Sequence, residues 1–161
     1  MTGAVKRGLG ASPQAGGRVF ASLILLLALM TAPAYAAVAL AKSSPIATVQ
    51  AVYAALPRPT PPDLLSRRLR LLVRRDQARR ERNLDFEWRS GGQDSPDLSP
   101  IHFHLAKLKG DAAVVETSFF NRGERRFRRF FLVREAGRWV VDDALLVPEN
   151  GKLADFLVGK G

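Results

Sequence analysis

Three tight turns in the C-terminal half of the chain, each with glycine in second position, constrain its fold most strongly. They are Lys109-Gly110, Arg122-Gly123 and Ala136-Gly137. Each lies between two runs of strand-forming residues, which is a strong signal for a β-hairpin. We therefore predict a four-stranded antiparallel meander. Its expected strands span residues 100–108, 111–121, 124–135 and 138–147.

The second turn and the third strand have an unusual composition. The segment RGERRFRRFF, residues 122–131, contains five arginines and three phenylalanines, which alone suggests a surface for nucleic-acid phosphates and bases. Two-residue turns instead place Arg129 directly opposite Glu116. The same register predicts two further contacts: Arg128 with Asp143, and Arg134 with Trp139. Because cross-strand pairs of opposite charge stabilise a sheet, we expect these arginines to bind partners within the domain rather than nucleic acid.

Two helices are expected before the meander. In the first, Ser44 can cap the N-terminus, and Pro45 fits the first helical position, which needs no N–H donor. Its apolar residues recur at spacings of three and four: Ile46, Val49, Val52, Tyr53 and Leu56. The prolines of 57–62 must end this helix, and Asp63 is expected to cap a second helix that starts at Leu64.

The second helix is amphipathic, with one irregularity. Leucine and valine side chains form one side and arginines the other, but Asp76 falls on the apolar side. Either the helix has begun to fray at this position, or the carboxylate points into a cavity.

An ordered loop is expected over 83–100, between the second helix and the meander. It brings four polar side chains close together: Asp85, Glu87, Gln93 and Asp94. Paired carboxylates can share proton transfer when their environments push the pKa values apart. More often, Asp residues beside glycines close turns through backbone N–H groups. Structural, ligand-binding and catalytic roles stay open for this loop, and Asp94 is expected to order it.

Two histidines, His102 and His104, point to one face of the first expected strand. This geometry can place two imidazoles on a metal ion, but a site needs a third ligand. No Asp, Glu or His at a fixed spacing suggests one. We therefore expect no metal and no cofactor.

The N-terminal segment has the pattern of a secretory signal peptide. A basic stretch over 1–18 precedes an apolar run over 19–41, and Ala34-Tyr35-Ala36 fits a cleavage site. We expect a signal peptide over 1–36, a short flexible lead over 37–43 and a single domain over 44–161. The exported protein would be periplasmic or secreted, with no transmembrane span in its mature part. The alternative is an uncleaved membrane anchor.

The chain has a formal net charge of +10, and cleavage after Ala36 would remove three basic residues and leave +7, since 10 − 3 = 7. The excess gathers on and just after the second helix, where the expected basic surface comprises Arg67, Arg74, Arg75, Arg79 and Arg82. Such a surface favours an acidic partner, here an acidic protein or an anionic envelope surface. The absence of cysteine excludes thiol catalysis, Cys-ligated zinc and disulfide exchange.

The order of two helices, a loop, a four-stranded meander ending in RWVVDDALL and a short C-terminal helix at KLADFL resembles one known architecture. It is similar to the cone-shaped α+β fold of the nuclear-transport-factor-2-like superfamily. Within it, the chain resembles exported bacterial domains of unknown function, through SPIATVQAVYAAL, LDFEWRSGGQD and the strands from VVETSFF to RWVVDD, over nearly all of 44–158. The resemblance implies a concave sheet face, roofed by helices, that encloses a pocket. Its relatives include isomerases, dehydratases, binding modules and dimeric adaptors.

We predict an exported, non-catalytic binding module whose ligand is a protein, an envelope component or a small molecule. A homodimer through the exposed sheet face is one arrangement it could adopt. The first alternative is a small-molecule isomerase or lyase that uses pocket carboxylates such as Asp76, Asp85 or Glu116. The second is an inhibitor or immunity-type protein of an exported enzyme. The residues expected to contact a ligand are Asp76, Asp85, Gln93, Asp94, Glu116 and Arg129.

Overall fold

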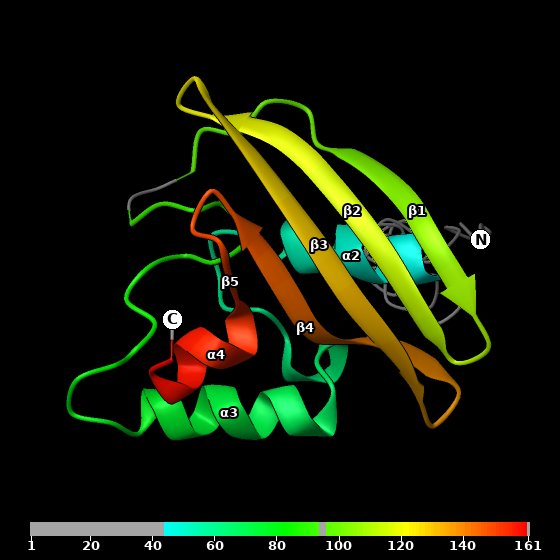
Figure 1. The fold of residues 1–161 in the computed structure, drawn as a ribbon, viewed down its shortest axis with the longest axis horizontal. Coiled ribbons are helices and arrows are strands. Elements are labelled where there is room, and N and C mark those ends of the chain that lie inside the picture. The colour runs from blue at the N-terminus through cyan, green and yellow to red at the C-terminus, as the bar shows by residue number, and fades with distance from the viewer. Residues whose placement is uncertain (1–43, 94–95, 161) are drawn as a thin grey trace, which may run out of the picture. The chain divides into compact units, whose positions relative to one another are not determined.

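The computed structural model describes residues 44–93 and 96–160 (Figure 1). The expected signal peptide and flexible lead, and Asp94 of the predicted loop, lie outside the described residues. None of the helices in these two ranges combines the length and the apolar character that a bilayer span requires.

The described domain is α+β, as predicted, and its antiparallel sheet has the strand order β1-β2-β3-β4-β5. The strands are β1 (His102–Lys109), β2 (Ala112–Asn121), β3 (Glu124–Glu135), β4 (Arg138–Val147) and β5 (Gly151–Lys152). The predicted four-stranded meander is confirmed in part: its four strands form, and a short fifth strand extends the sheet. Asn150 adopts a left-handed backbone with φ +55° and donates its N–H to the carbonyl oxygen of Leu146 at 2.7 Å. This turn returns the chain alongside β4.

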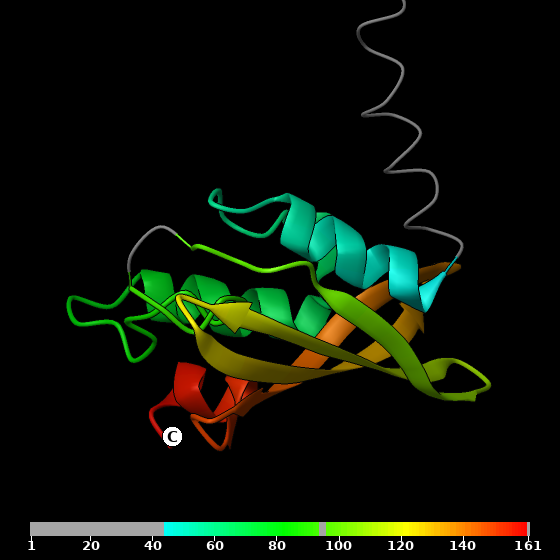
Figure 2. The same ribbon diagram turned by 90° about the horizontal axis from the view of Figure 1, so that it is seen from above.

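The helices are α2 (Pro45–Ala54), a 3-10 turn (Pro62–Leu64), α3 (Arg67–Gln77) and α4 (Leu153–Val158). Helix α2 lies across one face of the twisted sheet, as Figure 2 shows. Helices α3 and α4 lie side by side next to β4 and β5 (Figure 1).

The expected start of the first helix is confirmed, and that of the second is wrong. Ser44 is the N-cap residue of α2, and Pro45 is its first residue. Helix α3 begins only after Leu65, which is extended and bridges to Val141. The N–H of Ser66 donates to the carbonyl oxygen of Val141 at 2.8 Å. Leu65 and Ser66 therefore run alongside β4, and the helix starts at Arg67. The Ser66 hydroxyl, not Asp63, then caps the helix.

The strand register was predicted correctly for one hairpin in full and for another in part. Strands β2 and β3 pair as expected along their whole length, with Glu116 opposite Arg129. The first turn is shifted by one residue, to Gly110 and Asp111, and β1 has a bulge at Ala106. The pairing of β3 with β4 follows the expected register from the turn to the pair Leu132 with Val141. Asp142, the next residue of β4, has no cross-strand partner, and the register is shifted by one residue beyond it.

The irregularity at Asp142 is a bulge in β4, and it makes the predicted contact between Arg128 and Asp143 wrong. Beyond it, Asp143 lies opposite Phe131, and Arg128 lies opposite Leu146. The reason lies outside the sheet. Asp142 accepts a hydrogen bond from the Ser66 hydroxyl at 2.6 Å, so the start of α3 holds its carboxylate away from the ladder. The expected stacking of Arg134 on Trp139 is confirmed, with 4.9 Å between the guanidinium carbon and the ring centre.

The core lies between α2 and the inner face of the sheet, and Tyr53 is at its centre. The Tyr53 ring makes edge contacts with three phenylalanine rings, with centroid distances of 5.7 to 5.9 Å: Phe103, Phe119 and Phe130. Its hydroxyl lies 2.9 Å from that of Thr117. Burial raises the pKa of Tyr53 above its ordinary range, so the phenol stays neutral and supports the core.

Candidate functional site

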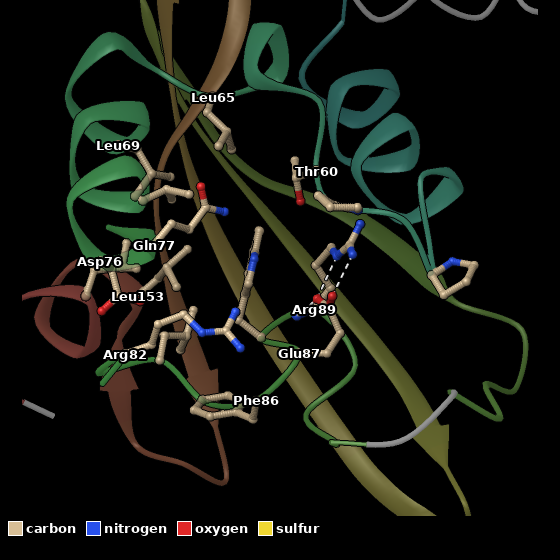
Figure 3. Close-up of a pocket in the computed structure, with 16 residues that line it drawn as sticks. Thr60, Leu65, Leu69, Asp76, Gln77, Arg82, Phe86, Glu87, Arg89 and Leu153 are labelled. Atoms are coloured by element: carbon tan, nitrogen blue, oxygen red, sulfur yellow. Dashed lines mark hydrogen bonds and ion pairs between the residues drawn. The ribbon is translucent and has the colours of Figure 1, made fainter. Parts of the chain in front are cut away.

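A cavity of about 220 Å³ lies beside this core (Figure 3). Four segments enclose it: the proline-rich segment after α2, helix α3, the 82–89 segment and helix α4. Its apolar lining comprises Pro57, Pro59, Leu65, Leu69, Val73, Leu84, Phe86, Trp88, Leu153 and Leu157. Three of these segments follow one another along the chain, and α4 joins them from more than sixty residues away, so the cavity exists only in the folded domain.

Asp76 contributes a buried carboxylate to the cavity wall. The residue is 2 % exposed, and helix α3 continues through it to Gln77, so the helix does not fray at this position. One carboxylate oxygen accepts the N–H of Asn83 at 2.7 Å, and the Asn83 amide donates to the carbonyl oxygen of Leu157 at 3.2 Å. Asp76 therefore also ties the end of α3 to α4.

Three other polar side chains of the lining have no hydrogen-bond partner within the described residues: Thr60, Gln77 and Arg82. The Thr60 hydroxyl oxygen is buried and makes no hydrogen bond there. Arg82 is exposed, and its side chain extends toward the middle of the lining residues in Figure 3. A threonine hydroxyl can both donate and accept, whereas a guanidinium only donates. Each can hydrogen-bond to an oxygen-bearing group of a ligand.

The remaining two charged groups of the lining neutralise each other. Arg89 is 1 % exposed, and its guanidinium lies 2.6 Å from the Glu87 carboxylate. It also donates to the carbonyl oxygens of Val52 and Arg58, at 3.1 and 2.8 Å. Because its donors are used inside the protein, this pair forms a rigid part of the cavity wall.

A second buried arginine fixes the loop that carries this pair. Arg128 is fully buried on the inner face of β3 and donates to the carbonyl oxygen of Trp88 at 2.8 Å. Its guanidinium also lies 3.0 Å from the Glu149 carboxylate. Burial lowers the pKa of Arg128, and the charge of Glu149 opposes this effect. The loop therefore presents Trp88 and Arg89 from a fixed position.

The other residues expected to bind a ligand do not meet Asp76. Asp85 is exposed and is not part of the cavity lining. Glu116 and Arg129 form an ion pair at 2.7 Å on the outer face of the sheet, which confirms the predicted contact. Gln93 borders a separate polar hollow of about 150 Å³ near Asn121.

The predicted basic residues are all exposed, on α3 and just after it: Arg67, Arg74, Arg75, Arg79 and Arg82. Arg70 and Arg74 border a groove of about 330 Å³, whose walls include Pro59, Pro61 and Pro62. The groove and the cavity share five lining residues: Pro59, Thr60, Leu65, Val73 and Gln77. The two hollows therefore adjoin each other.

Both histidines of β1 are exposed, and His104 lies opposite Glu116. In the part of the chain that the structure describes, no group of three or more His, Asp or Glu side chains is placed to hold a metal ion.

Sequence reasoning missed two residues that matter for this region. Thr60 lies in a proline-rich segment, and nothing in that pattern indicates that its hydroxyl becomes buried. Glu149 follows the meander and pairs with Arg128. Its only sequence signal is the excess of arginines in β3, which requires acidic partners from elsewhere.

Comparison with known proteins adds no identification, because no family, no curated protein and no solved structure matches the chain.

Proposed function

We propose that the chain is a non-catalytic binding module that holds a small, mainly apolar molecule in the cavity beside α3. The observation that carries the proposal is the unpartnered, buried hydroxyl of Thr60 in a lining that combines ten apolar residues with a few polar ones. An unsatisfied buried polar group costs free energy, and a ligand with a hydrogen-bonding group would remove that cost. Arg82 at the same cavity suits a ligand oxygen with negative charge.

The cavity is smaller than the roughly 300–1,000 Å³ typical of sites for drug-sized molecules. Its mixture of apolar walls and a few polar groups is nevertheless the usual composition of such sites. We therefore expect a ligand of modest size.

The isomerase or lyase alternative has less support from this arrangement. Proton transfer by paired carboxylates needs both groups at one site, whereas Asp85 is exposed and Glu116 is paired with Arg129 on the other side of the sheet. Asp76 is the one carboxylate of the three that borders the cavity, and the other carboxylate of the lining, Glu87, is paired with Arg89 at 2.6 Å. The inhibitor or immunity-type alternative rests on the basic residues alone and stays a prediction.

We also keep the resemblance to the nuclear-transport-factor-2-like superfamily as a proposal about the fold. The order of helices and strands supports it, with α2 across one sheet face and α4 after the meander. Export to the periplasm or the medium, and a homodimer through the outer sheet face, likewise stay predictions.

The binding proposal can be tested with a neutral apolar dye, N-phenyl-1-naphthylamine, whose fluorescence rises in apolar surroundings. Val73 lines the cavity, so Val73→Phe should fill it and weaken dye binding by about tenfold, or about 1.4 kcal/mol. Leu71→Phe is the matched control, because Leu71 lies on the same helix but is 47 % exposed. This variant should bind the dye like the wild-type protein.

Equal binding by all three proteins, or no binding by the wild type, would contradict the proposal. Thermal unfolding of each protein shows whether a loss of binding reflects a loss of folding. If the dye binds, native mass spectrometry of the protein purified from its own host can identify the bound molecule.

A further inference from the structure

The outward side of α3 carries an exposed leucine surrounded by arginines. Leu71 is 47 % exposed. Residues three and four positions away are neighbours on a helix surface, and all four of these neighbours are arginines: Arg67, Arg68, Arg74 and Arg75. An apolar side chain thus lies at the centre of a cationic ring, which we call the α3 ring.

Negative charge lies beside the first turn of the α3 ring, where Glu135 accepts the backbone N–H of Arg67 and Asp143 lies 3.8 Å from Arg68. The one acidic residue of the helix, Asp76, is buried on its inner side. Arg68 pairs with Asp142 at 2.9 Å, whereas the other three arginines of the ring have no ion pair within the described residues. Arg79, Arg80 and Arg82 extend the exposed positive surface beyond the helix. An excess of unpaired cations on one face attracts an anionic partner.

An open groove borders the α3 ring on one side. It has a volume of about 330 Å³, and its walls are three prolines, Leu65 and Val73. Arg70 and Arg74 contribute to the same walls. Apolar walls flanked by guanidinium groups suit a molecule that joins a phosphate to a hydrocarbon chain.

We propose that α3 docks on a lipid bilayer that contains anionic phospholipids. The arginines would lie at the level of the phosphates, Leu71 would enter the interface, and the groove would accept part of one lipid chain. An acidic protein would also match the charge. The bilayer fits better, because basic side chains spread around one apolar residue suit a continuous anionic surface with an apolar layer beneath it.

The inference goes beyond the cavity ligand and does not depend on it. The arginines Arg67, Arg74 and Arg75 are not part of the cavity lining. Their replacement should therefore leave binding of the apolar dye unchanged, so failure of one proposal can be told from failure of the other.

The test is sedimentation of the full chain with vesicles of phosphatidylcholine, with and without one third phosphatidylglycerol. We expect the wild-type protein to bind only the anionic vesicles. Binding should be lost between about 0.1 M and about 1 M salt, because the Debye length falls from about 10 Å to about 3 Å. The triple variant Arg67→Gln, Arg74→Gln, Arg75→Gln should bind on the order of 100-fold more weakly, since each cation near such a surface contributes about fivefold.

The matched control removes the same charge elsewhere: Lys107→Gln, Lys109→Gln, Arg125→Gln, all at exposed positions. It should keep at least a tenth of the wild-type affinity. Because all variants share the same N-terminal segment, any membrane affinity of that segment cancels in the comparison. Equal losses in the two triple variants, or no loss in the α3 variant, would overturn the proposal.

Leu71→Asn separates a bilayer from an acidic protein partner. This variant should bind anionic vesicles several-fold more weakly but bind soluble poly-glutamate like the wild type. Binding of poly-glutamate without binding of the anionic vesicles would overturn the proposal in favour of an acidic protein. Thermal unfolding must show that each variant is folded.

Discussion

Arg128, on the third strand, donates a hydrogen bond from its Nε to the carbonyl oxygen of Trp88 at 2.8 Å, and this bond attaches the 84–93 loop to the inner face of the sheet. The same guanidinium donates to the carbonyl oxygen of Val147 at 2.7 Å and to the Glu149 carboxylate at 3.0 Å. One buried side chain therefore joins the loop, β3 and the segment after β4.

Replacing this arginine should strongly destabilise the domain. In Arg128→Met, the buried acceptors and the Glu149 carboxylate lose their donor, and breaking a buried pair in this way costs about 3–5 kcal/mol. Urea unfolding should show this loss in the free energy of unfolding, and limited proteolysis should cut first within 84–93. The control Arg125→Met, at an exposed position of the same strand, should change stability by less than about 0.5 kcal/mol.

Gly91 should tolerate alanine less well than another glycine with a similar backbone. Both Gly91 and Gly137 have positive φ, +72° and +74°, so each alanine substitution carries a strain of about 1–2 kcal/mol. At Gly91 the added methyl would also collide with the Arg128 guanidinium and lie 2.8 Å from the Glu149 carboxylate, whereas Gly137 has open space. We expect Gly91→Ala to lower the free energy of unfolding by about 1 kcal/mol or more beyond the loss caused by Gly137→Ala. Equal effects would mean that the loop does not pack against Arg128 as described.

The link between α3 and β4 should weaken in acid. Burial raises the pKa of Asp142, but hydrogen bonds from Arg68 and Ser66 outweigh this effect and hold it below its ordinary value. A lowered folded-state pKa means that the stabilisation is fully present above the unfolded-state pKa of about 3.9. It is lost as pH falls through the folded-state value.

The measurement is urea unfolding of the wild type and of Asp142→Asn at pH values from neutral to about 3, around that unfolded-state pKa. At neutral pH the variant should be less stable by about 1–2 kcal/mol. The loss is smaller than for a fully buried ion pair, because the Arg68 side chain is half exposed and water screens the attraction. The difference should shrink toward the lowest pH. A difference that stays constant with pH would show that Asp142 does not act through its charge.

The outer pair of Glu116 and Arg129 should contribute little. Its atoms lie 2.7 Å apart, but the Arg129 side chain is 43 % exposed, so water and salt screen the attraction. A double-mutant cycle with Glu116→Gln and Arg129→Gln should give a coupling of about 0.2–1 kcal/mol that declines with added salt. A coupling well above this range would indicate that something else covers the outer face.

Sequence reasoning was most successful where the controlling interactions are local. Ser44 and Pro45 begin α2 as expected, because N-terminal preferences depend on adjacent residues. The register of β2 with β3 follows from the tight turn between them, where Arg122 and Gly123 have positive φ. Periodicity also placed Asp76 on the inner side of its helix, although it did not show what lies there.

Two of the errors have a different cause. Helix α3 starts later than expected because Ser66 first bonds to Val141, and β4 bulges where Asp142 turns toward the same serine. These partners are more than seventy residues apart. A choice between two local conformations was thus decided by a contact that local patterns do not contain.

The sequence by itself determined the α+β class, most element positions, the confirmed pair of Glu116 with Arg129 and the basic character of α3, because spacing and turn chemistry act over a few residues. Only the tertiary structure decided that Arg128 pairs with Glu149 and that Asp76, Thr60 and Arg82 border one cavity. The physical reason is that burial of a charge or a hydroxyl depends on which distant segments pack around it. Asp76 and Asp85 were both expected to contact a ligand, yet packing buries the first and leaves the second in water.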